Sequence, residues 1–110
     1  MLVLNEGVIN GKRLFPAQAV KAIRAGGDPR KFGTDYPALI GGSYTGLWWI
    51  YPGNGNIVAA RGVHGQTIYV DWDADMVLVR FASHPQSANS ANDPTSLPAY
   101  AALAAYLKSK

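Results

Sequence analysis

The middle of the chain constrains the fold most, because residues 44 to 82 alternate short β-forming segments with turns. Tryptophan, tyrosine, isoleucine and valine dominate the segments, and these residues favour extended backbone. The turns between them are short and rich in glycine, proline, asparagine and aspartate. Strands joined by such short connections must run antiparallel. The sequence therefore predicts an antiparallel sheet of three to four strands, at Tyr44–Tyr51, Ile57–Arg61, Gln66–Val70 and Met76–Ala82.

The segment before the sheet, residues 1–43, is expected to be a helical and loop lead-in. Pro16 suits the first turn of a helix, and the glycine pair at 26 and 27 ends that helix. The apolar residues Met1–Leu4 are too few to form a helix of their own, so they are expected to be the last turn of a longer one. This interpretation predicts that the chain is the C-terminal part of a longer protein.

A second helix is expected after the sheet, over residues 94–108, with its first turn near Ser96 or Leu97. Apolar residues recur there at intervals of three and four, which places them on one face. The expected fold class is α+β, in which one domain of residues 1–110 contains antiparallel strands at 44–83 and a C-terminal helix packed on one face of the sheet. The apolar face of this helix consists of Tyr100, Leu103, Ala104 and Leu107.

The composition of the chain argues against two classes of binding partner, nucleic acids and membranes. Charged residues make up 15% of the chain, and the net charge is +3. The basic residues are scattered without a run, so no nucleic-acid partner is expected. No apolar stretch is long enough to cross a bilayer, so no membrane partner is expected either. The N-terminus lacks the basic and apolar regions of a signal peptide, and the compartment stays unassigned.

Neither a metal nor a cofactor is expected. The chain has no cysteine, and its two histidines, His64 and His84, lack the spacing of a metal pair. The acidic run Asp71–Asp75 resembles the start of a calcium loop. The glycine and glutamate that such a loop needs later are replaced by Met76 and Ala82, so a hydrophilic hairpin tip is the better interpretation.

Four segments of the chain resemble one family of hydrolases. The run Tyr44–Trp49, then Ala60–Gln66, Ile68–Asp71 and Val77–Ser83, closely resembles the C-terminal segment of class C β-lactamase-like serine hydrolases. Within this penicillin-binding-protein superfamily, the similarity is to the 6-aminohexanoate-dimer hydrolases and related esterases. The resemblance covers nearly the whole chain but only about the last third of such an enzyme. It implies a parent activity of amide or ester hydrolysis through an acyl-serine, on a small substrate and without a cofactor.

The nucleophile of that family is absent from this chain. The family uses a Ser-x-x-Lys pair, in which a helix brings the lysine one turn from the serine. No serine of the chain is followed three residues later by lysine, and there is no Gly-x-Ser-x-Gly motif. The chain alone is therefore expected to be inactive.

The family's third motif, often Lys-Thr-Gly, matches Ala60, Arg61 and Gly62. Only the glycine is kept, which disfavours β-lactam hydrolysis because Ala60 replaces the cationic group that holds the β-lactam carboxylate. The resemblance implies that the next residue, Val63, supplies a backbone N–H that stabilises the oxyanion formed when the serine attacks. It also implies a substrate-binding strand edge formed by Arg61, Gly62, His64, Gly65 and Gln66.

Two alternatives remain open. The glycines Gly62 and Gly65 also fit a β-bulge without a function. The chain could also be a stand-alone, non-catalytic binding or interaction domain, with Trp48 or Trp49 at its contact surface. In either case the strands Tyr44–Tyr51 and Met76–Ala82 are apolar on both faces, which predicts a homo-oligomer or a missing N-terminal part that covers one face of the sheet.

Overall fold

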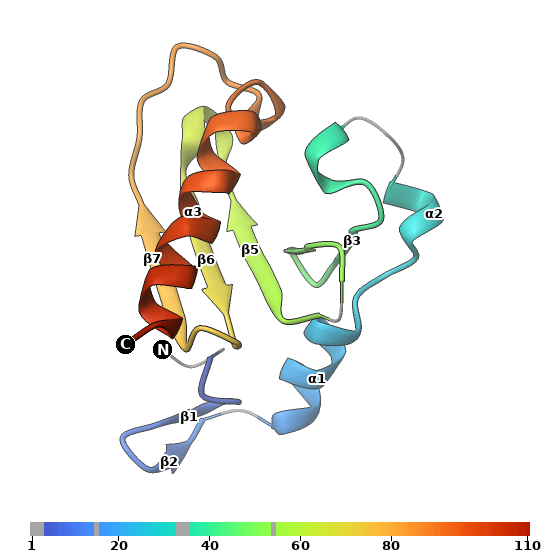
Figure 1. Ribbon diagram of the computed structural model, residues 1–110. Coiled ribbons are helices and arrows are strands. Elements are labelled where there is room, and N and C mark those ends of the chain that lie inside the picture. The colour runs from blue at the N-terminus through green and yellow to red at the C-terminus, as the bar shows by residue number, and fades with distance from the viewer. Residues whose placement is uncertain (1–3, 15, 33–35, 54) are drawn as a thin grey trace.

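The computed structural model describes residues 4–14, 16–32, 36–53 and 55–110 (Figure 1). Its centre is an antiparallel sheet of five strands, which follow one another in the sheet in chain order. The α+β class, the antiparallel pairing and the C-terminal helix predicted from the sequence are confirmed. The strands are β3 (Ser43–Thr45), β4 (Trp48–Ile50), β5 (Ile57–Arg61), β6 (Thr67–Asp71) and β7 (Met76–Arg80).

The predicted count of three to four strands is wrong, because the expected strand Tyr44–Tyr51 is a hairpin. Thr45 pairs with Trp48, and the two residues between them form the turn. Gly46 and Leu47 both have positive φ, 55° and 70°, as a two-residue turn between twisted strands requires. Leucine is unusual in this conformation, so the aromatic run gave no sign of a turn.

The lead-in contains more than the predicted helix. A two-residue hairpin, β1 (Val8–Ile9) and β2 (Lys12–Arg13), precedes α1 (Ala17–Ala25). A short helix α2 (Pro29–Phe32) and a 3-10 turn η1 (Pro37–Leu39) follow. Of the expected helical turn at Met1–Leu4, residues 1–3 lie outside the described part, and Leu4 lies in a turn where its carbonyl accepts a hydrogen bond from Trp72 Nε1 at 3.1 Å.

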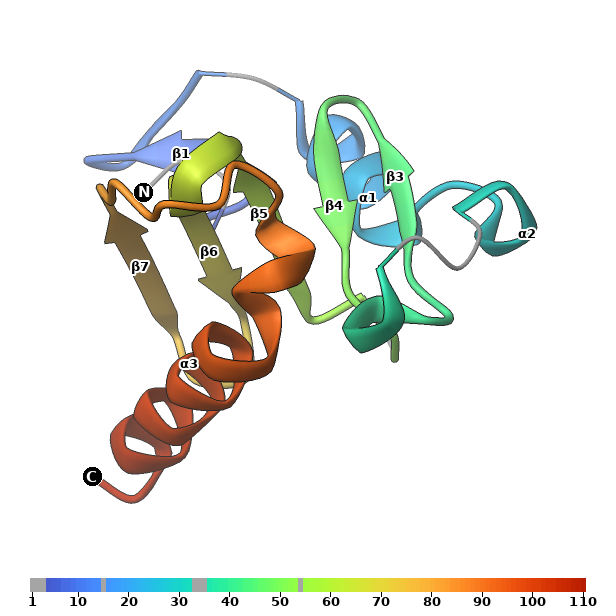
Figure 2. The ribbon, with the colours of Figure 1, turned by 90° about the horizontal axis from the view of Figure 1, so that it is seen from above.

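The C-terminal helix α3 (Asp93–Lys108) lies against one face of the sheet (Figures 1 and 2). It contributes Tyr100 and Ala104 to the larger of two core clusters, and the Tyr100 ring lies 5.1 Å from that of Tyr69 on β6. Two other residues of the predicted apolar face, Leu103 and Leu107, are 42% and 39% exposed. The helix therefore contacts the sheet through a narrower stripe than its sequence suggests.

The opposite face of the sheet is covered only in part. Ile50, Val58 and Val70 form a smaller core cluster there, against which Ile23 of α1 packs. Figure 2 shows α1 beside β4, away from β7. Toward β7, this face carries Val79 and Phe81, which are 56% and 89% exposed. No described residue covers the apolar surface that Val79 and Phe81 form.

A glycine in the loop between β4 and β5 provides a test of the packing against α1. Gly55 has φ +76°, and a Cβ atom placed on it would lie 2.4 Å from the carbonyl oxygen of Arg24. We expect Gly55→Ala to lower the free energy of unfolding by about 2–3 kcal/mol, from backbone strain and steric overlap together. Gly11→Ala is the matched control, because Gly11 has the same φ with open space around it. Equal losses in chemical denaturation of the two variants would contradict this packing.

Two buried tyrosines predict a loss of stability in alkali. Burial raises the pKa of Tyr69 to about 12, and burial also raises the pKa of Tyr51. Unfolded tyrosine ionises near pH 10, so the contribution of each group to stability is complete below that pH and falls as the pH rises toward the folded pKa. We expect a loss of about 1.4 kcal/mol per pH unit for each tyrosine above pH 10. Denaturation of wild type and Tyr69→Phe across this range measures it, and the variant should show the shallower slope.

Candidate functional site

The second half of β5 forms an open strand edge. On one side β5 pairs with β6 along its whole length, from Ile57 to Arg61. On the other side β4 pairs only with Val58 and Ala59, because the β3–β4 hairpin turns at Gly46 and Leu47. In the same register Trp48, the first residue of β4, lies opposite Ala60. The chain from Arg61 onward therefore continues past the end of its neighbour, and its backbone groups on that side face no described strand.

A tight turn, η2 (Val63–Gly65), follows this edge. His64 is in the left-handed region, with φ 60° and ψ 23°, and Gly65 has φ 90°. A side chain on residue 65 would also overlap the ring of His84. Glycine at this position is thus required by both backbone conformation and space.

The segment that connects β7 to α3 holds the turn in place. Asn89 donates from its Nδ2 to the Gly62 carbonyl at 2.7 Å and accepts from the Gly65 N–H at 3.1 Å. The His64 N–H donates to the Ser87 carbonyl at 3.0 Å. These bonds connect residues that are more than twenty positions apart, so no local pattern in the sequence could have indicated Asn89.

The side chains of the turn extend the same network. Gln66 hydrogen-bonds to both backbone groups of Ala82, which closes the turn against the end of β7. The ring of His64 meets the His84 carbonyl through Nδ1 at 2.7 Å, and the ring of His84 contacts Arg80. Gln66 and His64 therefore stabilise the turn.

Among the described residues, the backbone amide of Val63 has no hydrogen-bond partner. The Gly62 N–H donates to the Gln66 carbonyl at 2.9 Å, toward β6. Gly62 is extended, with φ −108° and ψ 166°, so the next amide points the opposite way, toward the side that β4 leaves open. Within the described part of the chain, no group accepts a hydrogen bond from the Val63 N–H. Val63 as a whole residue is 64% exposed.

The side chain of Arg61 lies on the other face of the sheet from the groove described below. Its Nη2 is 2.6 Å from Asp93 Oδ1 at the start of α3, and only 2% of the side chain is exposed. The guanidinium also lies over the rings of Trp49 and Tyr36, 5.0 and 5.7 Å from their centroids. The structure thus places the charge of Arg61 inside the protein, where it joins β5 to α3.

A groove of about 500 Å³ runs along the free face of the sheet beside the turn. Gly62 and Gln66 of the predicted set line it, together with the strand backbone at Arg61, whereas Val63, His64 and Gly65 do not. Its remaining walls are mostly apolar. They include Tyr44, Leu47, Ala60, Ile68, Val79 and Phe81.

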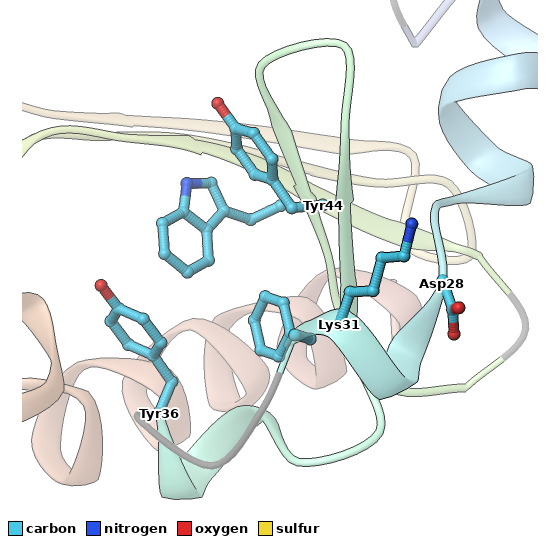
Figure 3. A pocket seen from close by; sticks show the side chains of 6 residues that line it. Asp28, Lys31, Tyr36 and Tyr44 are labelled. Carbon is cyan, nitrogen blue, oxygen red and sulfur yellow. The ribbon is translucent and has the colours of Figure 1, made fainter.

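A second pocket, of about 380 Å³, lies between α2 and the β3–β4 hairpin (Figure 3). Trp49 is at its centre, with the rings of Tyr36 and Tyr44 edge-on at 4.7 and 5.6 Å. Asp28 and Lys31 provide a carboxylate and an ammonium at the edge. The pocket therefore offers aromatic surface with polar groups at its edge.

The described residues contain neither a metal-binding cluster nor a membrane-spanning helix. The described ranges contain no group of three or more histidine, cysteine or acidic side chains that could hold a metal. Asp71 instead accepts a hydrogen bond from the Ala74 N–H at 3.1 Å, as expected of a hairpin tip. Over residues 4–14, 16–32, 36–53 and 55–110, no helix is long and apolar enough to cross a membrane.

A strand edge that ends in an unpartnered amide is the kind of site that enzymes of acyl transfer use to hold an oxyanion. Comparison with known proteins gives a more specific result. The chain is 34% identical over 87 residues to the 6-aminohexanoate-dimer hydrolase of Paenarthrobacter ureafaciens, a match that covers 76% of this chain and 22% of that enzyme. A solved Bacillus anthracis protein, provisionally assigned as a 6-aminohexanoate-dimer hydrolase, matches with a TM-score of 0.71 and 30% identity over 98% of this chain and 27% of that one.

The predicted resemblance is thereby confirmed, as a match to the C-terminal part of these β-lactamase-like hydrolases. No protein-family model matches the chain. The chain spans about a quarter of the length of the proteins it resembles. Because the curated match covers 76% of the 110 residues, it includes the middle of the chain and with it the turn at Val63.

The role of Asn89 can be tested in the isolated chain. We expect Asn89→Ala to cost about 1–2 kcal/mol of stability, because two hydrogen bonds to the turn are lost, one part-buried and one exposed. The Gly65 amide should then exchange with solvent roughly tenfold faster. Ser87→Ala is the matched control, since Ser87 contacts the turn through its carbonyl alone. Unchanged exchange at Gly65 in Asn89→Ala would show that Asn89 does not hold the turn.

Proposed function

We propose that this chain forms the oxyanion-binding strand edge of a serine hydrolase that cleaves amide or ester bonds through an acyl-serine. In this proposal the Val63 N–H is one of two donors to the oxyanion. The substrate lies along the edge of β5, between Gly62 and the apolar groove. The nucleophilic serine and its base come from outside these 110 residues.

The observation that carries the proposal is the position of the Val63 amide. It lies at the end of an open strand edge, and no described residue accepts a hydrogen bond from it. The turn around it is held by Asn89 on two sides, so the amide needs little reorganisation to meet a developing charge. The similarity to 6-aminohexanoate-dimer hydrolases supports the same assignment.

A chimera tests the proposal directly. The aligned segment of the Paenarthrobacter ureafaciens enzyme is replaced by the corresponding residues of this chain, and hydrolysis of the 6-aminohexanoate dimer is measured. We expect activity, because the host supplies the serine and its base while this chain supplies the strand edge. A folded chimera without hydrolysis of the dimer or of simple esters would overturn the assignment. The isolated chain serves as the inactive control.

The aromatic pocket supports a second candidate function, a non-catalytic binding domain. Trp49 lies in this pocket with Phe32, Tyr36 and Tyr44, and such surfaces bind apolar or aromatic groups. If this is the function, small aromatic ligands should change the fluorescence of the wild-type chain. Trp49→Phe should abolish that change, while Trp72→Phe, which alters a tryptophan outside the pocket, should not.

The free face of the sheet also supports self-association of the isolated chain. Ile68, Val79 and Phe81 leave an apolar surface beside β7, whose outer edge is unpaired in the described sheet. Such a surface favours pairing between copies. We propose a homodimer at micromolar concentration, and sedimentation equilibrium of wild type and Phe81→Ser measures it. A monomeric wild type would exclude the dimer.

A further inference from the structure

A small, partly enclosed cavity lies between the sheet and the first turns of α3. Its volume is about 10 Å³, and it is lined on the sheet side by Arg61, Thr67 and Arg80. Asn92, Asp93 and Ser96 line it on the helix side. It shares Arg61, Thr67 and Arg80 with the groove, and it shares no lining residue with the aromatic pocket. We propose that this cavity is a binding site for one water molecule, which joins Arg61, Asn92 and Asp93.

Three buried polar atoms of its lining residues carry the proposal. Among the described residues, no group forms a hydrogen bond with Arg61 Nη1, Asn92 Nδ2 or Asp93 Oδ2. The side chains of Arg61 and Asp93 are only 2% and 6% exposed, so bulk solvent does not reach them. An unsatisfied buried polar group costs roughly 1–3 kcal/mol, and three such costs at one cavity favour a ligand that meets them together.

The chemistry of the three atoms selects the ligand. Arg61 Nη1 and Asn92 Nδ2 are donors, and Asp93 Oδ2 is an acceptor. A water molecule accepts two hydrogen bonds and donates in return, so it matches all three. An anion would face the Asp93 carboxylate, and a cation would face the guanidiniums of Arg61 and Arg80.

The size of the site agrees with this choice. A polar cavity needs a volume of at least about 10–15 Å³ to hold one water molecule, and the water needs two to four polar partners. The cavity lies at this lower limit, which fits one water molecule. The water would join β5 to the first turn of α3, beside the direct ion pair between Arg61 and Asp93. This site does not depend on the proposed hydrolase function.

Water oxygen-17 relaxation dispersion on the full chain tests the site, since it counts water molecules held for long times. Wild type should show such a water, and Asn92→Leu, which removes a donor and places a methyl group in the cavity, should lose the contribution of one. Asn5→Leu, at an exposed position that does not line the cavity, is the matched control and should retain it. Equal contributions from wild type and Asn92→Leu would overturn the proposal.

A second measurement needs no variant, in case Asn92→Leu fails to fold. A direct cross-peak between water and the Asn92 side-chain amide is expected in the nuclear Overhauser spectrum of wild type. Absence of that cross-peak overturns the proposal. Loss of the long-lived water on adding chloride would also overturn it, since an anion would then be the preferred ligand.

Discussion

Replacing Val63 by proline in the hydrolase chimera is expected to lower kcat by roughly 10²–10³-fold, because the substitution removes one backbone donor to the oxyanion. The Val63 N–H is the candidate donor at the open edge of β5, and no described residue uses it. The loss should fall on kcat more than on KM, since the charge on the oxygen develops only in the transition state.

The local backbone can accommodate proline at position 63 without a change of conformation. Val63 is the first residue of a 3-10 turn, a position that tolerates proline, and its own N–H forms no hydrogen bond with the described chain. Gly62 has φ −108° and ψ 166°, the extended conformation that the residue before a proline adopts. The fold should therefore survive the change.

Val63→Ala is the matched control for this experiment. It keeps the N–H and removes most of an exposed side chain, so its kcat should stay within a few-fold of the starting chimera. Equal kcat values for the proline and alanine variants would exclude the Val63 amide from the reaction. A loss in both variants would assign the role to the valine side chain instead.

Removing the charge of Asp93 is expected to destabilise the isolated chain by about 3–5 kcal/mol, because it leaves the Arg61 guanidinium buried without a counter-charge. Arg61 Nη2 and Asp93 Oδ1 are 2.6 Å apart, and neither side chain is more than 6% exposed. Chemical denaturation of Asp93→Asn measures the loss. Asp28→Asn is the control, since its partner Arg30 is 90% exposed and exposed pairs contribute at most about 1 kcal/mol.

A double variant separates the two contributions. Arg61→Met combined with Asp93→Leu removes both charges and keeps apolar volume in their place. We expect it to be more stable than Asp93→Asn, since no uncompensated charge remains. If Asp93→Asn loses no more stability than Asp28→Asn, Arg61 is not confined as the structure places it.

Local patterns in the sequence were sufficient for much of the fold. The segments Ile57–Arg61 and Met76–Arg80 could be predicted as strands because they are short, mostly apolar runs that turns bound closely. Pro16 marked the start of α1 correctly, because proline fits the first helical turn. The hairpin inside Tyr44–Tyr51 escaped prediction, because Leu47 adopts a conformation that leucine rarely takes.

The candidate site could also be predicted from the sequence only in part. The run Gly62–Gln66 could be singled out from the sequence, because glycines at such spacing indicate a special backbone and because the run resembles a hydrolase motif. Only the tertiary structure decided what each residue does there. The register of β5 directs Arg61 to Asp93 and away from the groove, the short β4 opens the strand edge, and Asn89 holds the turn from more than twenty residues away. Such contacts depend on which strands pair and on where the neighbouring strand ends, and neither can be predicted from the local sequence.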